Sequence, residues 1–204
     1  MFGYLPLVFI LCYAASANGK QARIFGGQEA RIEDFPFMAS LRTRDEGFRC
    51  GAAIISDRWL LSAAHCTDGC KIRNLQIVVG TNDSMSSRGV FYDIDQVWRL
   101  CSKYTDCKVN AEARPSCNHL CNGKCNQIIM SARPNTRIRE SNICTEGRRG
   151  QGACRGDSGG PMIVDNQLVG LASGVVECGV GFPDVYTRVA SYLDWIVEKT
   201  DIRG

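Results

Sequence analysis

The sequence lacks three features that mark common protein classes. Its 204 residues carry a formal net charge of only +3 with both signs interspersed, which excludes the electrostatic signature of a nucleic-acid-binding protein. It contains no internal repeat or long linker. Beyond its first residues it has no apolar run long enough for a membrane anchor. The length suits one domain or two small packed halves.

Cysteine, in contrast, is abundant, with twelve in the chain. Residues 1–11 are mostly apolar and Ala15-Ser16-Ala17 has a small-x-small pattern, so residues 1–17 are predicted to be a secretory signal peptide. Export places the other eleven cysteines in an oxidising compartment, where disulfides persist. We therefore expect a secreted, extracellular protein in which one thiol stays free or pairs between chains.

Short apolar runs separated by turn residues predict a β-rich chain. The predicted strands are residues 51–55, 59–63, 75–79, 90–97, 161–164, 168–173 and 185–189. Residues 190–199 have apolar positions at helical spacing and predict a short terminal helix. Residues 101–125 hold five cysteines without a clear period, so no strand is predicted there. The sequon that begins at Asn82 fits either a plain turn or an N-glycosylation site.

Two polar residues are candidates for nucleophilic catalysis. Gly-Asp-Ser-Gly-Gly-Pro at residues 156–161 places Ser158 between glycines, which let substrate approach and let backbone N–H groups face a developing oxyanion. A serine hydroxyl also needs a base to remove its proton. The chain has only two histidines, and His65 lies beside Cys66, which can pin it. The alternatives are an ordinary glycine turn and a buried structural histidine.

Three motifs in order carry a family resemblance. They are Arg-Ile-Phe-Gly-Gly at residues 23–27, Ala-Ala-His-Cys at 63–66 and the 156–161 motif, and with them the chain resembles the chymotrypsin-fold serine peptidases. Gly-Phe-Pro-Asp-Val-Tyr-Thr-Arg-Val and Tyr-Leu-Asp-Trp-Ile are similar to arthropod chymotrypsin-like and crab-collagenase-like members. The resemblance implies an all-β fold of two antiparallel barrels with a C-terminal helix, spanning residues 24–204.

The resemblance also implies a mechanism. His65 acts as general base and then general acid, Ser158 forms an acyl-enzyme, and the N–H groups of Gly156 and Ser158 make the oxyanion hole. The expected partners are protein or peptide substrates and protein inhibitors. No cofactor, metal or nucleic acid is expected.

A zymogen is implied by the same comparison. Residues 18–23 are the activation propeptide, and a partner protease cuts the Arg23-Ile24 bond. The new Ile24 ammonium then buries itself against Asp157, because a buried charge needs a partner.

Motif positions imply three disulfides and leave five cysteines unassigned. The pairs are Cys50–Cys66, Cys125–Cys144 and Cys154–Cys178, with Cys121 a competitor for the place of Cys125. The unassigned residues are Cys70, Cys101, Cys107, Cys117 and Cys121. The cysteine run 117–125 also resembles a metal site, although disulfides fit an exported chain better.

The family's pocket positions indicate a non-tryptic preference. Gly152 replaces the aspartate that selects Lys or Arg in the trypsin branch, and Asp184 stands where most members have a pocket-wall glycine. This pair is similar to the crab-collagenase type and implies chymotryptic or broad cleavage with tolerance for basic residues. Ser173 begins the wall that aligns substrate, although the usual aromatic residue after it is missing. Asp184 in an ordinary surface turn is the alternative.

The third catalytic residue is the weakest part of the resemblance. No segment matches the strand that carries the family's aspartate; Asp93 and Asp95 lie in a strand resembling an earlier one, and Asp106 lies at a plausible distance from His65. In another alignment, Asn110 and Ala111 take the places of the family's usual Asn-Asp pair, so no aspartate stands at the catalytic position. The middle of the chain is also shorter than the family needs, so we expect an incomplete first barrel and crossover.

Two other functions are compatible with the sequence. One is a catalytically weak or inactive homologue that binds partners through the same cleft, which the missing aspartate favours. The other treats the cysteine-rich residues 101–125 as a toxin-like module.

Overall fold

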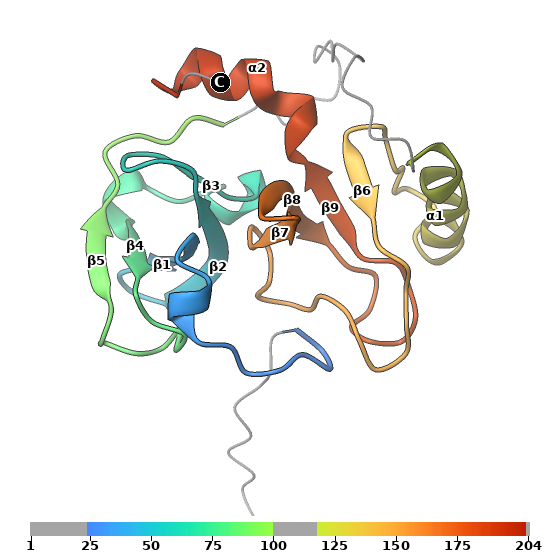
Figure 1. The fold of residues 1–204 in the computed structure, drawn as a ribbon, viewed down its shortest axis with the longest axis horizontal. Coiled ribbons are helices and arrows are strands. Elements are labelled where there is room, and N and C mark those ends of the chain that lie inside the picture. The colour runs from blue at the N-terminus through green and yellow to red at the C-terminus, as the bar shows by residue number, and fades with distance from the viewer. Residues whose placement is uncertain (1–23, 100–117, 203–204) are drawn as a thin grey trace, which may run out of the picture.

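The computed structural model describes residues 24–99 and 118–202, with the backbone alone for 118–124. Its strands form two antiparallel sheets that face each other, with the C-terminal helix lying across one end (Figure 1). The predicted signal peptide, the propeptide, Asp106, Asn110 and the cysteines at 101, 107 and 117 lie outside the described residues.

The first sheet has five strands. In spatial order they are β3 (Leu60–Leu61), β2 (Gly47–Ile54), β1 (Met38–Thr43), β4 (Leu75–Val79) and β5 (Val90–Asp93). Short 3-10 turns occur at Ile32–Asp34, Ala64–Cys66 and Ile72–Asn74. The buried core of this half is Ala39, Leu41, Cys50, Ala52, Ala63, Cys66, Leu75 and Ile77. All four residues of β5 are exposed, so β5 forms an uncovered edge of the sheet.

The second sheet has four strands. Their order is β6 (Asn142–Cys144), β9 (Val185–Arg188), β8 (Gln167–Gly174) and β7 (Pro161–Val164). Asp165 and Asn166 join β7 to β8 with φ of 49° and 61°, as a two-residue type I′ hairpin turn requires. A 3-10 turn (Val189–Tyr192) leads into α2 (Leu193–Lys199). Ile196 of α2 packs with Leu171 of β8 and with Ala53 of β2, so the terminal helix belongs to the core between the halves.

The β-rich plan with a C-terminal helix is confirmed. The predicted strand 90–97 ends at Asp93, and the predicted strand 59–63 pairs only at Leu60–Leu61. Strand β1 was not predicted. No helix was predicted around residues 118–132 either, where the structure forms α1 (Asn118–Ala132). Its apolar residues have little helical periodicity, and what anchors it is tertiary: Ile129 is buried and Cys125 is cross-linked to Cys144 of β6.

Neither described sheet closes into a barrel. The first ends at β3 and β5, and the second ends at β6 and β7. An open cavity of about 1860 Å³ lies between the two halves and is lined by both sheets. This agrees with the expectation of an incomplete barrel. Among the described helices, none has the length and apolar character needed to cross a bilayer.

Candidate active site

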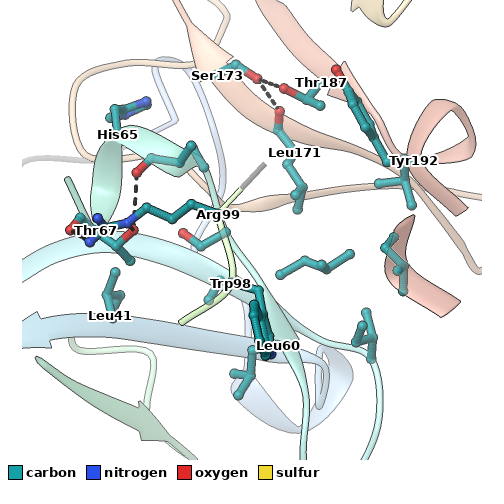
Figure 2. Close-up of a pocket in the computed structure, with 18 of the residues that line it drawn as sticks. Leu41, Leu60, His65, Thr67, Trp98, Arg99, Leu171, Ser173, Thr187 and Tyr192 are labelled. Atoms are coloured by element: carbon teal, nitrogen blue, oxygen red, sulfur yellow. Dashed lines mark hydrogen bonds between the residues drawn. The ribbon is translucent and has the colours of Figure 1, made fainter. Parts of the chain in front are cut away.

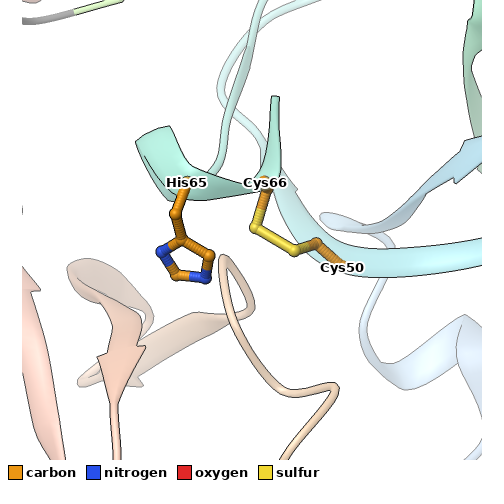
Figure 3. Close-up of side chains that lie close together, drawn as sticks. All are labelled: Cys50, His65 and Cys66. Atoms are coloured by element: carbon orange, nitrogen blue, oxygen red, sulfur yellow. A yellow bond between two sulfur atoms is a disulfide. The ribbon is translucent and has the colours of Figure 1, made fainter. Parts of the chain in front are cut away.

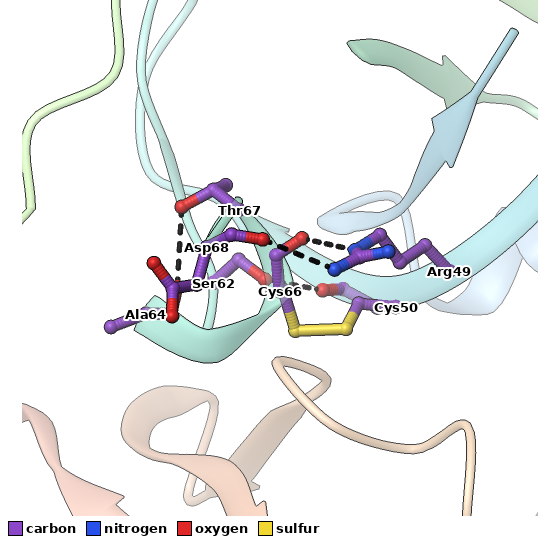
Figure 4. The surroundings of a disulfide bond; sticks show 8 residues. Arg49, Cys50, Ser62, Ala64, Cys66, Thr67 and Asp68 are labelled. Carbon is purple, nitrogen blue, oxygen red and sulfur yellow. Dashed lines mark hydrogen bonds between the residues drawn. A yellow bond between two sulfur atoms is a disulfide. The ribbon is translucent and has the colours of Figure 1, made fainter. Parts of the chain in front are cut away.

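His65 lies on a short turn that is fastened to the first sheet. Cys66, the next residue, forms a disulfide with Cys50 of β2 (Figure 3). The Arg49 Nε donates a 2.6 Å hydrogen bond to the Cys66 carbonyl, and Thr67 Oγ1 donates to Ala64 O (Figure 4). The turn is thus fixed covalently and by hydrogen bonds, whereas the His65 imidazole is exposed.

The imidazole of His65 and the sulfurs of Cys50 and Cys66 have donor atoms within 4.8 Å of one another. Because the two sulfurs are joined in a disulfide, neither is a thiolate that could bind a metal ion. The cluster therefore holds the histidine in place without forming a metal site.

The nucleophile loop lies between the two sheets. The Gly51 N–H of β2 donates to the Ser158 carbonyl at 2.8 Å, and the Gly159 N–H donates to the Ala172 carbonyl of β8 at 2.7 Å. Ser158 itself is half-buried. Since Gly51 follows Cys50, which is bonded to Cys66, a short covalent path joins the backbone partner of Ser158 to His65. The structure thus brings the two predicted catalytic segments together.

Glycine is required beside the nucleophile. A β-carbon at Gly159 would lie 2.2 Å from Ser62 Oγ and 2.4 Å from the Gly51 carbonyl, and its φ is +77°. Gly156 also has a positive φ, +101°. Both conformations are strained for other residues. The glycines of the motif therefore permit a close approach of the sheets and a sharp turn at Ser158.

The predicted activation pair requires a cut between Arg23 and Ile24, and the chain is intact at this bond. Ile24 is 49% exposed. Asp157 Oδ2 accepts a 2.8 Å hydrogen bond from the Cys154 N–H, within the loop closed by the Cys154–Cys178 disulfide. Phe25, next to Ile24, exchanges two backbone hydrogen bonds with Gly152, at 2.8 and 3.0 Å.

Asp184 lies where a side chain at position 152 would project, since a β-carbon added at Gly152 would be 2.8 Å from Asp184 Oδ2. Asp184 is 7% exposed, and its Oδ2 accepts a 2.7 Å hydrogen bond from the Ala153 N–H. Burial raises the pKa of the Asp184 carboxyl, while the Ala153 hydrogen bond acts in the opposite direction. Desolvation, with contributions from Asp184 and Asp157, raises the pKa of nearby Tyr186 to about 12. Asp184 is therefore a buried carboxylate beside the predicted pocket floor, not a residue of an exposed surface turn.

Ser173 lies across the cavity from His65 (Figure 2). Its hydroxyl bonds to the Leu171 carbonyl at 2.8 Å and contacts the Thr187 hydroxyl at 2.6 Å. These bonds fix the end of β8, from which the wall segment 173–176 continues along the cavity. Ser158, Gly152 and Asp184 do not line this cavity.

No carboxylate in the described part of the chain hydrogen-bonds to His65. Asp93 pairs with Arg44 and accepts from Gln76 Nε2 at 3.1 Å, and Asp95 is exposed. A cation does contact the turn after His65: Arg99 Nε donates to Thr67 Oγ1 at 2.9 Å (Figure 2). Sequence reasoning missed Arg99, because no motif marks it.

The disulfides Cys50–Cys66, Cys125–Cys144 and Cys154–Cys178 are those implied by the resemblance. Cys70 forms no disulfide within the described residues. Asn82 is exposed, and its Nδ2 donates to the Ala30 carbonyl at 3.3 Å, so the sequon lies on the surface.

Comparisons with known proteins agree with this arrangement. The trypsin family model matches residues 24–110 and 115–196. Neutrophil elastase of Mus musculus is 30% identical over 217 residues, covering 86% of this chain and 82% of that protein. Trypsin of Phaedon cochleariae is 29% identical, with 88% and 89% covered, and venom serine protease 34 of Apis mellifera is 30% identical, with 88% and 59% covered. The chain therefore belongs to the trypsin family of serine endopeptidases.

Proposed function

We propose that the protein is a secreted endopeptidase that hydrolyses peptide bonds in proteins through Ser158 and His65. The observation that carries the proposal is the position of the nucleophile loop. The Gly51–Ser158 hydrogen bond and the Cys50–Cys66 disulfide connect the serine backbone to the histidine turn. His65 removes the proton of Ser158 as the hydroxyl attacks the scissile carbonyl. The Gly156 and Ser158 N–H groups stabilise the oxyanion, and protonated His65 gives its proton to the amine that departs as the peptide C–N bond breaks. Water, deprotonated by His65, then hydrolyses the acyl-enzyme.

The chain is made as a zymogen on this proposal. Cutting after Arg23 frees the Ile24 ammonium, which pairs with Asp157. Before the cut, that carboxylate accepts a hydrogen bond from Cys154 within its own loop. Replacing Ile24 by glycine in correctly cut protein should remove most activity, because the ammonium loses the apolar side chain that seats it.

Substrate preference follows from the pairing of Gly152 with Asp184. A glycine floor carries no charge that selects Lys or Arg, which favours large apolar side chains, and the buried Asp184 carboxylate beside it tolerates a basic one. A panel of peptides that differ only before the scissile bond tests this. Cleavage after large apolar residues, with weaker cleavage after Lys and Arg, is expected. Strict Lys or Arg cleavage would contradict it.

The decisive experiment is active-site labelling. The purified chain is cut after Arg23 and treated with a fluorophosphonate, which reacts with an activated serine. Labelling is expected at Ser158 and should be lost in Ser158→Ala and strongly reduced in His65→Ala. Ser131→Ala is the matched control, since this exposed hydroxyl bonds to the Ile128 carbonyl on α1 and does not line the cavity.

An inactive binding homologue is the alternative outcome. The observation in its favour is that no described carboxylate hydrogen-bonds to His65, while Arg99 places a cation on the turn that follows it. Well-folded, correctly cut protein that resists labelling would support it.

A further inference from the structure

Three arginines follow α1 and line the cavity that also contains His65 and Ser173. They are Arg133, Arg137 and Arg139, and all three are exposed. They come from the loop that joins α1 to β6, whereas His65 belongs to the opposite half of the molecule. The proposed catalytic base therefore shares one open space with a strongly basic wall.

Arg133 is hydrogen-bonded to the segment that is predicted to align substrate. Its Nη2 donates a 3.0 Å hydrogen bond to the Val176 carbonyl, and Val176 lies three residues after Ser173 in the segment that lines the cavity. A guanidinium has five N–H donors, so one bond to a carbonyl leaves most of them available to an incoming carboxylate. The bond also holds the charge at the wall.

The positive charge of Arg133 and Arg137 is not neutralised within the described chain. The ion pairs there involve Arg31, Arg44, Arg58, Arg148 and Lys199. Two exposed acidic residues lie nearest along the chain to the segments involved: Glu140, which lines the same cavity three positions after Arg137, and Glu177, which follows Val176. Neither is ion-paired with Arg133 or Arg137.

The remaining carboxylates of the cavity lie on other segments. Asp57, Asp68, Asp93 and Asp95 belong to the half that carries the first sheet, and Asp201 follows α2. Asp93 is paired with Arg44, and Asp201 with Arg58. The α1–β6 loop thus brings three arginines and Glu140 to the cavity, while the other lining segments carry charges of both signs, including Arg58, Arg99 and Lys199.

We propose that Arg133 and Arg137 form a cationic subsite that binds acidic side chains of the peptide substrate on the N-terminal side of the scissile bond. This rests on the proposed function and on the prediction from the sequence that the substrate backbone aligns with the segment that begins at Ser173. A residue before the cleaved bond then lies near Val176, whose carbonyl holds Arg133. The substrates are accordingly acidic peptide segments.

The expected effect is moderate because the site is open to solvent. Exposed ion pairs are weak, so an acidic residue should improve binding roughly 1.5-fold to fivefold. Salt screens such pairs, and at about 0.5 M the preference should largely vanish, because the Debye length falls below about 5 Å. A purely structural role for either arginine predicts no such salt dependence.

Binding is measured by fluorescence anisotropy on full chain cut after Arg23 and carrying Ser158→Ala, which prevents turnover. The probes are two labelled peptides that differ only in Glu or Gln before the scissile position. The Glu peptide should bind more tightly, and Arg133→Gln with Arg137→Gln should abolish the difference. Arg133→Lys with Arg137→Lys should retain most of it. Arg88→Gln, a charge change at an exposed residue outside the cavity, is the control and should change nothing.

The proposed subsite would be refuted if the Glu and Gln peptides bound equally well, or if neither peptide bound detectably. An equal loss of both peptides in the glutamine variant would also refute it. Fluorophosphonate labelling of the chain with intact Ser158 reports separately on the proposed function. Labelled protein without a Glu preference refutes only the subsite, while unlabelled protein that still prefers Glu refutes only the catalytic proposal.

Discussion

Asp184 Oδ2 would lie 2.8 Å from a β-carbon placed at Gly152. The Asp184 carboxyl therefore occupies the space that a side chain at the floor of the predicted pocket would need, and the absence of a side chain at 152 is a steric requirement. The φ of Gly152 is +143°, a conformation that other residues adopt with strain. A substitution at Gly152 would therefore have to accommodate both the positive φ and the neighbouring Asp184 carboxyl.

Gly152→Ala should lower the free energy of unfolding by about 1–3 kcal/mol through backbone strain and the clash with Asp184. Urea unfolding measures the change. Gly150→Ala is a matched control, since Gly150 has a φ of +79° but a β-carbon added there would have nothing within 4 Å. Its cost should be the smaller of the two. Equal costs would show that contact with Asp184 contributes nothing.

Asp184→Asn should stabilise the protein at neutral pH, and the gain should disappear in acid. The folded-state pKa of Asp184 is raised above 3.8 by burial, so the ionised form destabilises the fold once the pH exceeds that value. The stability that Asp184 contributes, compared with Asp184→Asn, is greatest below about pH 4 and is lost as the pH rises through the folded-state pKa. Thermal unfolding of both proteins across this range checks the sign. A gain that grows in acid would contradict it.

Removing the Cys50–Cys66 disulfide should destabilise the protein by about 3 kcal/mol, the cost expected for a loop of this length. The two cysteines are 16 residues apart. The double variant Cys50→Ala, Cys66→Ala should also lose fluorophosphonate labelling, because the His65 turn loses its covalent anchor. The Arg49 hydrogen bond to Cys66 alone should not keep it in place. Full labelling of the folded variant would show that the anchor is dispensable.

Arg188→Leu should destabilise the second sheet by about 2–4 kcal/mol, because charge-assisted hydrogen bonds in a buried site are lost. Arg188 is 9% exposed, and its guanidinium donates to the Glu140 carbonyl at 2.9 Å and to the Asn142 carbonyl at 3.1 Å. These bonds attach the start of β6 to β9. Arg58→Leu, which removes an exposed arginine, should change stability little. Similar unfolding free energies for the two variants would show that the Arg188 hydrogen bonds to the Glu140 and Asn142 carbonyls do not stabilise the sheet.

Local patterns predicted most of the strands because their alternation and turn residues act over a few neighbouring positions. Strand β4 has the predicted bounds, and the hairpin at Asp165 follows from residues that tolerate positive φ. Helix α1 was missed for the opposite reason. Its weak periodicity carries little signal, and the buried Ile129 and the Cys125–Cys144 disulfide that anchor it are tertiary features.

The sequence by itself determined the identities of Ser158 and His65 as candidates, the need for glycine around the nucleophile, and the family of the chain, because these depend on residue types at short spacing. Only the tertiary structure decided that the Asp184 carboxyl fills the space beside Gly152, that Arg99 contacts the His65 turn at Thr67, and that Arg133 donates to the Val176 carbonyl. The first two contacts each join residues 32 positions apart, and the third spans 43. Such contacts arise from the way the two open sheets pack, and no local pattern encodes that packing.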